Sequence, residues 1–338
     1  MQKTFVFLFL FFTSQQLFPT SPKIEKLISQ MTLEEKIGQM VQINKIKYEE
    51  DPSIISRYFI GSVLSGGGDA PKVNEAASWA NLIETMQKET EKTPLKIPLL
   101  YGIDAVHGHG NVFGATIFPH NIGLGATRNK ALVEKIGEIT ALELARTGVH
   151  WNFAPAVSVP KDIRWGRTYE GYSENTSLVN ELSEAYLKGL QKGFRQPGFP
   201  RILGTAKHFI GDGGTSWGSS STNDYKLDQG VADISEEELR KVHLPPYIKA
   251  IEAGVKTIMV SYSSWGGKRM HGQKYLLTNV LKKELKFKGF LISDWAALDQ
   301  LPGSHTEQII AALNAGIDMV MLPYRPLEFI KEAKRAVK

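Results

Sequence analysis

The fold is decided by the stretch from Lys256 to Trp295, which reads KTIMVSYSSWGGKRMHGQKYLLTNVLKKELKFKGFLISDW. Both of its ends, Lys256–Ser263 and Gly289–Trp295, carry a short apolar run of the length expected for a buried strand. Between them, Lys274–Lys286 has its apolar residues at the spacing of an amphipathic helix. A strand, a helix and a second strand predict a parallel pair, because parallel neighbours need a crossover connection that is usually a helix.

The same alternation continues on both sides of this unit. Apolar runs predict further strands at Ile37–Ile43, Gly61–Leu64, Pro98–Val106, Trp151–Val157, Ile202–Ile210 and Asp318–Pro323. Amphipathic stretches predict further helices at Pro71–Glu91, Lys130–Arg146, Asn175–Lys192, Ser235–Ala253 and His305–Asn314. The run Ile37–Ile43 has an alternative, because a helical pattern that begins near Leu33 overlaps it. Strands alternating with helices predict an α/β fold, a single-domain (β/α)8 TIM barrel, which routinely takes roughly 250 residues.

The composition is that of an ordinary globular protein. Of 338 residues, 42% are hydrophobic and 22% are charged, and 40 Lys+Arg against 35 Asp+Glu leave a net charge of +5. Basic residues alternate with acidic ones and form no run interleaved with aromatics, so no nucleic-acid partner is expected. The chain has no cysteine, which excludes disulfides, thiolate metal ligands and a cysteine nucleophile.

The N-terminus has the order of a secretory signal peptide. Lys3 supplies a positive charge, Phe5–Phe12 is an unbroken apolar run, and Thr13–Gln16 is small and polar. We therefore expect residues 1–20 to be a signal peptide, residues 21–338 to form the barrel domain, and the protein to be secreted. A buried N-terminal strand is the alternative, which the lack of polar alternation disfavours. No segment reaches the roughly 20 apolar residues that span a bilayer, so no membrane partner is expected.

Polar side chains follow five of the predicted strands, at the point where each strand ends. They are Asp104, His107 and His109 after the third strand, Arg164, Arg167 and Glu170 after the fourth, Lys207, His208 and Asp212 on the fifth, Tyr262 after the sixth, and Asp294 and Trp295 after the seventh. The carboxyl ends of barrel strands share one face, where barrel enzymes build their active sites. Two long connections, Ser158–Glu174 and Gly211–Ile234, follow strands at this face, and long loops usually carry function.

Asp294 is the strongest candidate for a reactive group. It follows an apolar strand directly, so its carboxylate should lie in the mouth of the barrel. The alternative role is a helix N-cap, a common position for aspartate. Lys207, His208 and Arg164 favour the first interpretation, because cationic donors keep a carboxylate ionised. With the indole of Trp295, these groups suit a pyranose, whose hydroxyls need charged hydrogen bonds and whose C–H face needs an apolar surface.

His107 and His109 allow a different hypothesis, because a His-x-His pair beside a lysine and an aspartate is typical of metal-dependent hydrolases built on barrels. The glycines that follow the strand loosen the backbone there, which favours His107 as a local hydrogen-bond partner instead. Gly108, Gly110 and Gly114 do not have the spacing of a nucleotide-binding loop. We therefore expect neither a metal nor a cofactor.

Several motifs carry a resemblance to a known family. They are Tyr101–Gly108 (YGIDAVHG), Ala115–Arg128 (ATIFPHNIGLGATR), Arg164–Arg167 (RWGR), Lys207–Gly214 (KHFIGDGG) and Ile292–Trp295 (ISDW). With these motifs in order and at matching spacings, the chain resembles the N-terminal barrel domain of glycoside hydrolase family 3, in its β-glucosidase and exo-β-glucanase branch. The resemblance implies a (β/α)8 barrel and retaining hydrolysis of β-linked glucosides or oligosaccharides from the non-reducing end.

The resemblance also implies roles for single residues. The family nucleophile falls on Asp294, and Tyr262 matches the tyrosine beside it. Trp295 matches one aromatic wall of the glucose-binding slot. The groups that hold the sugar hydroxyls fall on Asp104, Arg164, Lys207 and His208. No metal or cofactor belongs to this set.

The chain departs from the family pattern in places. Asp162-Ile163-Arg164 stands where the family commonly has Asp-Pro-Arg, and Ser219–Thr222 replaces a stretch that often carries an acidic residue. In the glucosidase branch the general acid/base lies on a C-terminal α/β sandwich domain downstream of the barrel, which the resemblance implies as a partner in cis. A retaining mechanism needs two carboxyl groups about 5–5.5 Å apart. We therefore expect the domain to be absent from residues 1–338 and their activity alone to be impaired.

Two other functions stay open from the sequence. One is a non-catalytic barrel that binds sugar, and the other is the metal-dependent hydrolase that uses His107 and His109. The hexosaminidase branch of the family takes its acid/base from a histidine on the loop after the Lys-His motif. No histidine lies between His208 and His243, and His243 falls within a predicted helix, which argues against that branch.

Overall fold

The structure, a computed structural model, describes residues 21–192, 199, 201–222 and 224–337. The predicted signal peptide, residues 1–20, lies outside the described residues. The described residues divide into two units, one that ends at Gln30 and one that begins at Met31. In the first unit the described residues form helix α1 (Pro22–Gln30), none of whose side chains is buried.

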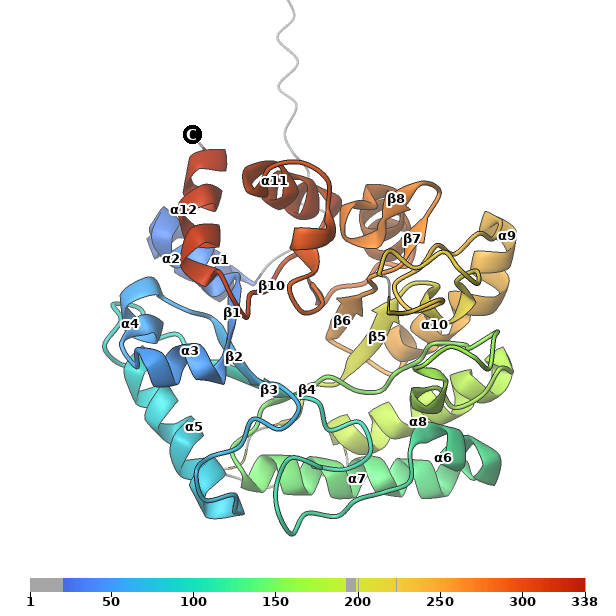
Figure 1. Cartoon of the computed structure of the whole chain (residues 1–338). Coiled ribbons are helices and arrows are strands. Elements are labelled where there is room, and N and C mark those ends of the chain that lie inside the picture. Colours follow the sequence, from blue (N-terminus) through green and yellow to red (C-terminus); the bar gives the residue numbers. More distant parts are fainter. Residues whose placement is uncertain (1–20, 193–198, 200, 223, 338) are drawn as a thin grey trace, which may run out of the picture. The chain divides into compact units, whose positions relative to one another are not determined.

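Parallel strands form the centre of the second unit (Figure 1). They are β1 (Val41–Asn44), β2 (Ser62–Ser65), β3 (Leu100–Ile103), β4 (Trp151–Asn152), β5 (Thr205–Phe209), β6 (Thr257–Val260), β9 (Phe290–Ile292) and β10 (Val320–Met321). Five of them pair in the order β10-β1-β2-β3-β4, and three pair in the order β5-β6-β9. A short antiparallel hairpin, β7 (Ser264–Trp265) and β8 (Lys268–Arg269), follows β6.

Single parallel bridges join the edges of these two sheets. Residue Trp151 of β4 pairs with Leu203, just before β5, and Ile292 of β9 pairs with Met319, just before β10. The pairing therefore runs through all eight strands and returns to its start. The predicted (β/α)8 barrel is confirmed by this ring of parallel pairs.

Helices surround the ring of strands in the second unit (Figure 1). The α-helices are α2 (Leu33–Gln39), α3 (Lys45–Glu50), α4 (Ile54–Tyr58), α5 (Ala76–Thr90), α6 (Asn121–Thr127), α7 (Lys130–Arg146), α8 (Thr176–Lys192), α9 (Glu236–Glu238), α10 (Pro245–Glu252), α11 (His305–Ala315) and α12 (Pro326–Ala336). The π-helical segments are η3 (Leu239–His243) and η5 (Tyr275–Glu284), and the 3-10 segments are η1 (Thr168–Glu170), η2 (Asp212–Gly214), η4 (Met270–Gly272) and η6 (Ala297–Gln300).

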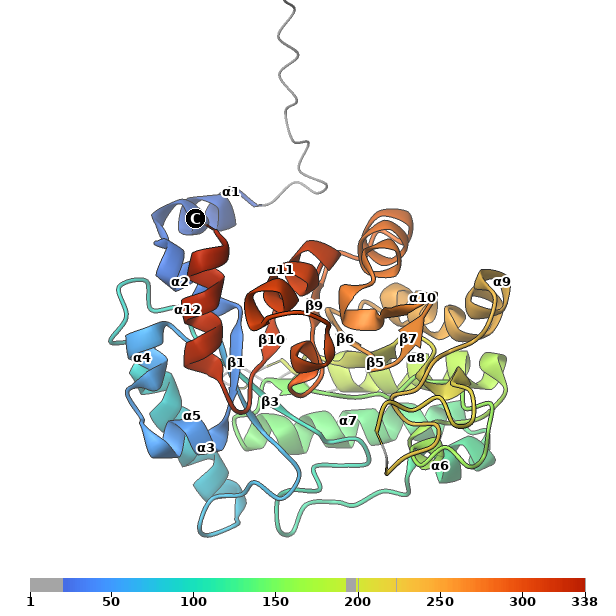
Figure 2. The ribbon, with the colours of Figure 1, turned by 45° about the horizontal axis from the view of Figure 1, so that its top comes forward.

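Helices α7 and α8 lie side by side in both views (Figures 1 and 2). Glycine permits this close approach, because a Cβ on Gly189 of α8 would lie 1.9 Å from the carbonyl oxygen of Glu134 on α7. Gly137 of α7 meets the backbone of α8 in the same way. Within the residues that the structure describes, no helix combines the length and apolarity that a bilayer crossing requires.

Alternate residues of the strands belong to two separate hydrophobic clusters. The larger cluster, which includes Val63 and Ile258, also contains the buried residues of the surrounding helices. The smaller cluster consists of Leu64, Trp151, Phe153, Met259, Ile292, Met319 and Met321, which have the opposite strand parity and fill the inside of the barrel. There the indole Nε1 of Trp151 donates to Thr205 and Thr257 at 2.7 and 3.0 Å. The barrel interior is therefore a packed core and not a channel.

The predicted strand Ile37–Ile43 is wrong in its first half. Helix α2 extends to Gln39, and β1 begins only at Val41. The helix is held by a capping box, in which Thr32 accepts from the backbone N–H of Glu35 and Glu35 accepts from that of Thr32. The apolar residue Ile37 is therefore buried as part of a helix, which is the alternative that the overlapping pattern indicated.

Candidate active site

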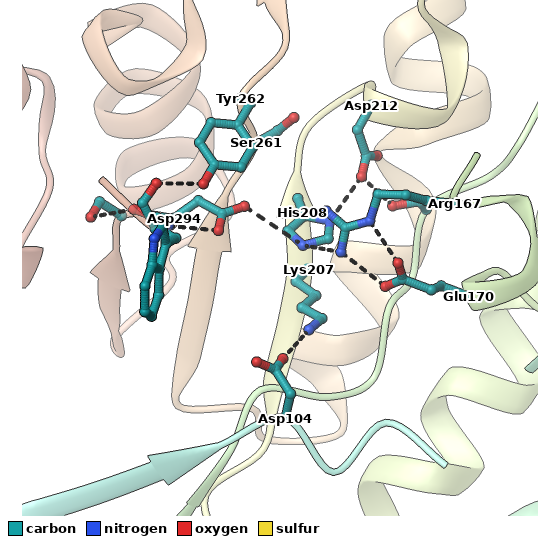
Figure 3. Close-up of polar contacts among 12 residues, drawn as sticks. Asp104, Arg167, Glu170, Lys207, His208, Asp212, Ser261, Tyr262 and Asp294 are labelled. Atoms are coloured by element: carbon teal, nitrogen blue, oxygen red, sulfur yellow. Dashed lines mark hydrogen bonds and ion pairs between the residues drawn. The ribbon is translucent and has the colours of Figure 1, made fainter. Parts of the chain in front are cut away.

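The polar side chains at the carboxyl ends of the strands gather in one place (Figure 3). Asp104 follows β3, Lys207 and His208 lie on β5, and Asp294 follows β9. The loop after β4 adds Arg167, whose guanidinium points toward the same centre (Figure 3). Residues that lie far apart in the sequence are thus brought together because parallel strands end on one face of the barrel.

Hydrogen bonds of the backbone and of one carboxylate oxygen hold Asp294 in place. Its other carboxylate oxygen has no hydrogen-bond partner among the described residues. Its N–H donates to Nε2 of His271 at 3.1 Å, and its Oδ1 accepts from the N–H of Trp295 at 2.7 Å. Its Oδ2 is buried and accepts no hydrogen bond among the described residues. A buried acceptor without a partner is costly, and such an atom is available to a ligand.

The neutral state of His271 supports this arrangement. Burial, together with a smaller contribution from the positive charge of Arg269, lowers the pKa of His271 to about 3. Its Nε2 therefore carries a lone pair and accepts the backbone N–H of Asp294. The imidazole fixes the backbone at the end of β9, so the direction of the Asp294 side chain is set before any ligand binds.

Lys207 and Asp104 form an ion pair across the mouth of the barrel. The Nζ atom of Lys207 lies 2.6 Å from Oδ1 of Asp104. The lysine side chain is 4% exposed, whereas the aspartate side chain is 43% exposed. Asp104 therefore presents its carboxylate to solvent as an acceptor for hydroxyl groups. The ammonium of Lys207 has three donors, so the bond to Asp104 leaves others for a ligand.

His208 has a defined tautomer because of the groups on its two sides. A guanidinium can only donate, so the 3.0 Å contact between Nη2 of Arg167 and Nε2 of His208 makes Nε2 an acceptor. The ring proton then lies on Nδ1, which donates to Oδ2 of Asp212 at 2.9 Å. Asp212 is fixed in turn by the hydroxyl of Ser158 at 2.7 Å. The Nε2 atom lies 3.8 Å from the unpartnered Oδ2 of Asp294.

Arg167 and Glu170 form a bidentate ion pair next to His208. Nε and Nη2 of Arg167 donate to the two carboxylate oxygens of Glu170 at 2.6 and 2.9 Å. Burial alone would raise the pKa of Glu170, but Arg167 and the charge of Lys207 together lower it to about 2. Burial would also lower the pKa of Arg167, and Glu170 holds it above its ordinary value instead. Glu170 is therefore ionised at neutral pH and cannot donate a proton.

Tyr262 and Trp295 form the wall beside Asp294. The hydroxyl of Tyr262 donates to the carbonyl oxygen of Trp295, and burial together with the charge of Asp294 raises the pKa of Tyr262. The indole Nε1 of Trp295 donates to the hydroxyl of Tyr324 at 3.0 Å. The indole ring lies beside Gly66, where an added Cβ would sit 3.6 Å from it. The half-buried indole is thus an apolar plate next to the carboxylate.

The structure brings together six of the seven residues predicted for the site, and Arg164 lies elsewhere. Its side chain is 56% exposed and pairs with Asp162 on its own loop. Its guanidinium lies over the ring of Trp217, 4.0 Å from the ring centroid. A role for Arg164 in holding sugar hydroxyls stays a prediction, and the arginine that contacts His208 is Arg167.

The sequence analysis assigned no role to Arg167, Glu170 or Asp212. The motif Arg164–Arg167 contains two arginines. Its sequence does not show which of the two side chains points toward His208. A signal was present in the spacing, because Glu170 follows Arg167 by one turn and opposite charges at that spacing often pair. Asp212 follows His208 by four residues and was named among the polar residues at the strand ends without a role of its own.

The two histidines of the metal hypothesis do not share a site. His109 is fully buried, its Nε2 contacts the hydroxyl of Thr147 at 2.9 Å, and burial lowers its pKa to about 4. His107 contacts the carbonyl oxygen of Phe118 at 2.8 Å and stacks on the ring of His120. Across the described ranges, no group of three or more His, Cys, Asp or Glu residues could hold a metal ion.

The arrangement can bind a polyhydroxylated ring and react with it. The carboxylate of Asp104 and the cations Lys207 and Arg167 offer charged hydrogen bonds, and Trp295 offers an apolar face. The buried Oδ2 of Asp294, which accepts no hydrogen bond among the described residues, offers a nucleophile. Charged hydrogen bonds around a buried carboxylate are suited to a reaction in which positive charge develops on a sugar ring.

Comparisons with known proteins agree with this geometry. Residues 32–338 match the family described as the glycosyl hydrolase family 3 N terminal domain. The chain is 36% identical over 329 residues to a lysosomal beta glucosidase of Dictyostelium discoideum, and the match covers 89% of this chain and 39% of that protein. The chain therefore spans less than half of that relative.

Solved structures show the same relationship. An exo-1,3/1,4-beta-glucanase of a Pseudoalteromonas species is 43% identical with a TM-score of 0.83, over 93% of this chain and 39% of that one. A beta-glucosidase of Listeria innocua, solved in complex with glucose, is 28% identical with a TM-score of 0.75, over 92% of this chain and 44% of that one. Through the family match and these relatives, the chain belongs to glycosyl hydrolase family 3, and its residues 32–338 are the N-terminal domain of that family.

Proposed function

We propose that this barrel takes part in the hydrolysis of terminal, non-reducing β-D-glucosyl residues from β-glucosides or β-glucans, by a retaining double displacement. The observation that carries the proposal is the buried Oδ2 of Asp294, which has no partner among the described residues and lies 3.8 Å from Nε2 of His208. The relatives support the choice of sugar, because they are a beta glucosidase, a beta-glucanase and a beta-glucosidase in complex with glucose.

In the first step, Oδ2 of Asp294 attacks the anomeric carbon from the face opposite the leaving group. A bond forms between the carboxylate and that carbon, the glycosidic bond breaks, and the leaving oxygen takes a proton. In the second step water attacks the same carbon and frees Asp294, so the released glucose keeps the β configuration. Hydrogen bonds from Lys207 and Arg167 to the ring hydroxyls strengthen as charge develops on the ring, and this difference lowers the barrier.

The proton for the leaving group is proposed to come from outside the described site. Three carboxylates around Asp294 are each engaged by a cation or a hydrogen-bond donor: Asp104 by Lys207, Glu170 by Arg167 and Asp212 by His208 (Figure 3). Glu170, whose pKa is lowered to about 2, is ionised at neutral pH, and a charged carboxylate cannot act as a general acid. We therefore propose that a second domain in cis supplies the acid, as the greater length of the relatives suggests.

If the acid lies on a second domain, the hydrolysis rate of this chain should depend on whether the leaving group needs a proton. A 2,4-dinitrophenyl β-glucoside needs no proton to leave, so this chain should hydrolyse it far faster than a β-linked disaccharide of glucose. Steady-state rates on both compounds give the comparison. Equal and high rates would mean that an acid lies within this chain.

The proposed function is tested by the configuration of the first product and by one substitution. During hydrolysis of the dinitrophenyl glucoside, proton NMR should show β-glucose before α-glucose appears by mutarotation. The variant Asp294→Asn should lose this activity, by about a thousandfold or more, because it lacks the nucleophile. The appearance of α-glucose first, or an active Asp294→Asn variant, would contradict the proposal.

We also propose that the protein is secreted, on the strength of the signal-peptide pattern in residues 1–20. Expression in a host with a secretory pathway should place the protein in the medium with a new N-terminus near residue 20. Protein retained inside the cell with Met1 intact would contradict this.

A further inference from the structure

Arg269, in the short hairpin after β6, has no role in the proposed reaction, yet it contacts a residue of the candidate active site. Its backbone pairs with that of Ser264 across β7 and β8. In its guanidinium, Nη1 donates to the carbonyl oxygen of Tyr262 at 2.8 Å and to that of Gln229 at 2.9 Å. One nitrogen atom therefore links the tyrosine beside Asp294 to the loop after β5.

The backbone of Tyr262 lies beyond the strand that precedes it. Strand β6 ends at Val260, so the carbonyl oxygen of Tyr262 is outside the hydrogen bonds that join the strands. Arg269 supplies a donor for that oxygen instead. At its other end, Tyr262 donates its hydroxyl to the carbonyl oxygen of Trp295, next to Asp294 (Figure 3). A shift of the Tyr262 backbone would therefore move a hydroxyl that lies beside the nucleophile.

The second carbonyl that Arg269 contacts is itself held in place. Gln229 has a φ of 58°, a conformation that few residues other than glycine adopt. Its side-chain Oε1 accepts from Nε2 of Gln300 at 2.8 Å. The next carbonyl oxygen along the loop, that of Gly230, accepts from the N–H of Ser264 at 2.9 Å. The loop after β5 is thus bonded to the hairpin and to η6, and it gives the guanidinium a fixed support.

The charge of Arg269 has no carboxylate partner. None of the ion pairs among the described residues includes it, and its hydrogen bonds there go to the two carbonyl oxygens. Burial lowers the pKa of Arg269, because its surroundings disfavour the charged form. A cation that is partly removed from water without a counter-ion costs stability. Costs of this kind are found where a group serves the function of the protein.

The same charge acts on His271, two residues further along the chain. It contributes to the low pKa of His271, for which burial is the main cause. The neutral ring accepts the backbone N–H of Asp294. The ring centroids of Tyr262 and His271 lie 6.2 Å apart. Arg269 therefore influences both of the residues that hold the chain around the nucleophile.

We infer that Arg269 is a positioning residue, which fixes the backbone of Tyr262 and through it the carboxylate of Asp294. The tyrosine hydroxyl transmits the effect, because it donates to the carbonyl oxygen of the residue that follows Asp294. The inference rests on the proposed function, in which Asp294 attacks the anomeric carbon. Arg269 then affects the rate of that attack and not the hydrogen bonds that bind the sugar hydroxyls.

Pre-steady-state kinetics of the full chain on 2,4-dinitrophenyl β-glucoside test the inference, because the burst of dinitrophenolate reports the attack of Asp294. Arg269→Met removes the donor and the charge. It should lower the burst rate constant at saturation by about tenfold, since small misplacements of reacting groups are costly. The glucoside concentration that half-saturates the burst should change by less than about twofold. Arg269→Lys should keep most of the rate constant, because one nitrogen atom meets both carbonyl oxygens and an ammonium has three donors.

Lys268→Met is the matched control. It removes the neighbouring positive charge of the same hairpin, which is exposed and is not hydrogen bonded to either carbonyl oxygen. It should leave both kinetic constants unchanged. Urea unfolding shows whether each variant is folded. If Arg269→Met is not, Arg269→Gln replaces it, with a smaller loss expected because its amide keeps an uncharged donor.

A double-mutant cycle identifies the route through Tyr262. Tyr262→Phe removes the hydroxyl that transmits the effect, so adding Arg269→Met should lower the rate constant by less than about a further twofold. An unchanged rate constant in Arg269→Met, an equal loss in Lys268→Met, or losses that multiply in the double variant would overturn the inference. An unaltered chain that releases no dinitrophenolate would instead contradict the proposed function, and the inference with it.

Discussion

The loop after β4 contains two arginine–carboxylate pairs that differ in burial. Arg164 and Asp162 pair at the surface, whereas Arg167 and Glu170 pair against His208. The carboxyl pKa is lowered to about 2 in both. For Asp162 the cause is the hydrogen bonds from Arg164, and for Glu170 the pair with Arg167 must first overcome the cost of burial.

The difference in burial determines how much each pair contributes to stability. A surface ion pair such as that of Arg164 and Asp162 is screened by water and contributes little to stability. A buried pair matters more for stability, because removing one partner leaves an uncompensated charge in the protein interior. The loop after β4 therefore uses an arginine–carboxylate pair twice, once as a buried pair at Arg167 and once as a surface pair at Arg164.

The largest expected effect comes from breaking the buried pair. Arg167→Met keeps much of the apolar stem but leaves Glu170, whose side chain is 11% exposed, without its cation. Breaking a buried pair typically costs roughly 3–5 kcal/mol, and we expect about 3 kcal/mol here, because the Arg167 side chain is 27% exposed. Urea unfolding measures the free energy, and Arg164→Met is the matched control, for which little change is expected. Equal losses in both variants would break the comparison.

The next effect concerns the proton on His208. Asp212→Asn replaces the charged acceptor of the Nδ1 proton, so Nε2 gains a proton in part of the molecules and faces Arg167 and Asp294 as a donor. We expect the rate constant on a dinitrophenyl glucoside to fall by about tenfold or more. Nitrogen-15 NMR of the imidazole should show the tautomer change directly.

Ser158→Ala is the control for this experiment. It removes a hydrogen bond to Asp212 but keeps the charge of that carboxylate. It should therefore keep the His208 tautomer of the unaltered chain. An unchanged tautomer in Asp212→Asn, together with a lower rate, would show that Asp212 acts on structure alone.

A smaller effect should appear in the dependence of stability on pH. The pKa of Glu170 is lower in the folded chain, at about 2, than the roughly 4.3 of an unfolded glutamate. Its contribution to stability is therefore complete above that unfolded value and is lost as the pH falls toward 2. Each proton taken up on unfolding changes the free energy by up to about 1.4 kcal/mol per pH unit.

Urea unfolding between about pH 5 and pH 2.5 measures this slope. Glu170→Gln removes the titrating group, so its stability should depend less on pH over the same range. Asp162→Asn is the surface counterpart and shows how much of the slope a screened pair supplies. A Glu170→Gln variant with the same slope as the unaltered chain would show that Glu170 does not carry the difference.

The sequence was enough to predict the barrel, because its strands and helices alternate with clear periods. The bounds were less certain where one residue satisfies two patterns. Ile37 continues both an apolar run and a helical face, and the capping box at Thr32 and Glu35 decides in favour of the helix. The position of Ile37 in the hydrophobic pattern did not decide this by itself, because an apolar side chain is buried in either structure.

The residues of the candidate site that lie on or just after strands could be predicted, whereas those in the long loop could not. Asp294 directly follows a strand, and Lys207 and His208 lie near the end of one, so the barrel geometry alone brings them together. Arg164 and Arg167 lie in a long loop, where the direction of a side chain depends on contacts with distant residues such as His208. The spacing of Glu170 from Arg167 favours an ion pair between them but does not give the direction of either side chain, so the choice between the two arginines needed the structure.

The central claim is that Asp294 forms a covalent bond to carbon one of a glucosyl unit, and mass spectrometry of a trapped adduct tests it most directly. The full chain is incubated with 2,4-dinitrophenyl 2-deoxy-2-fluoro-β-D-glucoside, digested and sequenced by tandem mass spectrometry. The account predicts one fluoroglucosyl group per chain, on Asp294, and none on Asp294→Asn. A chain that binds glucose but forms no adduct, or an adduct on another carboxylate such as Glu170, would contradict it.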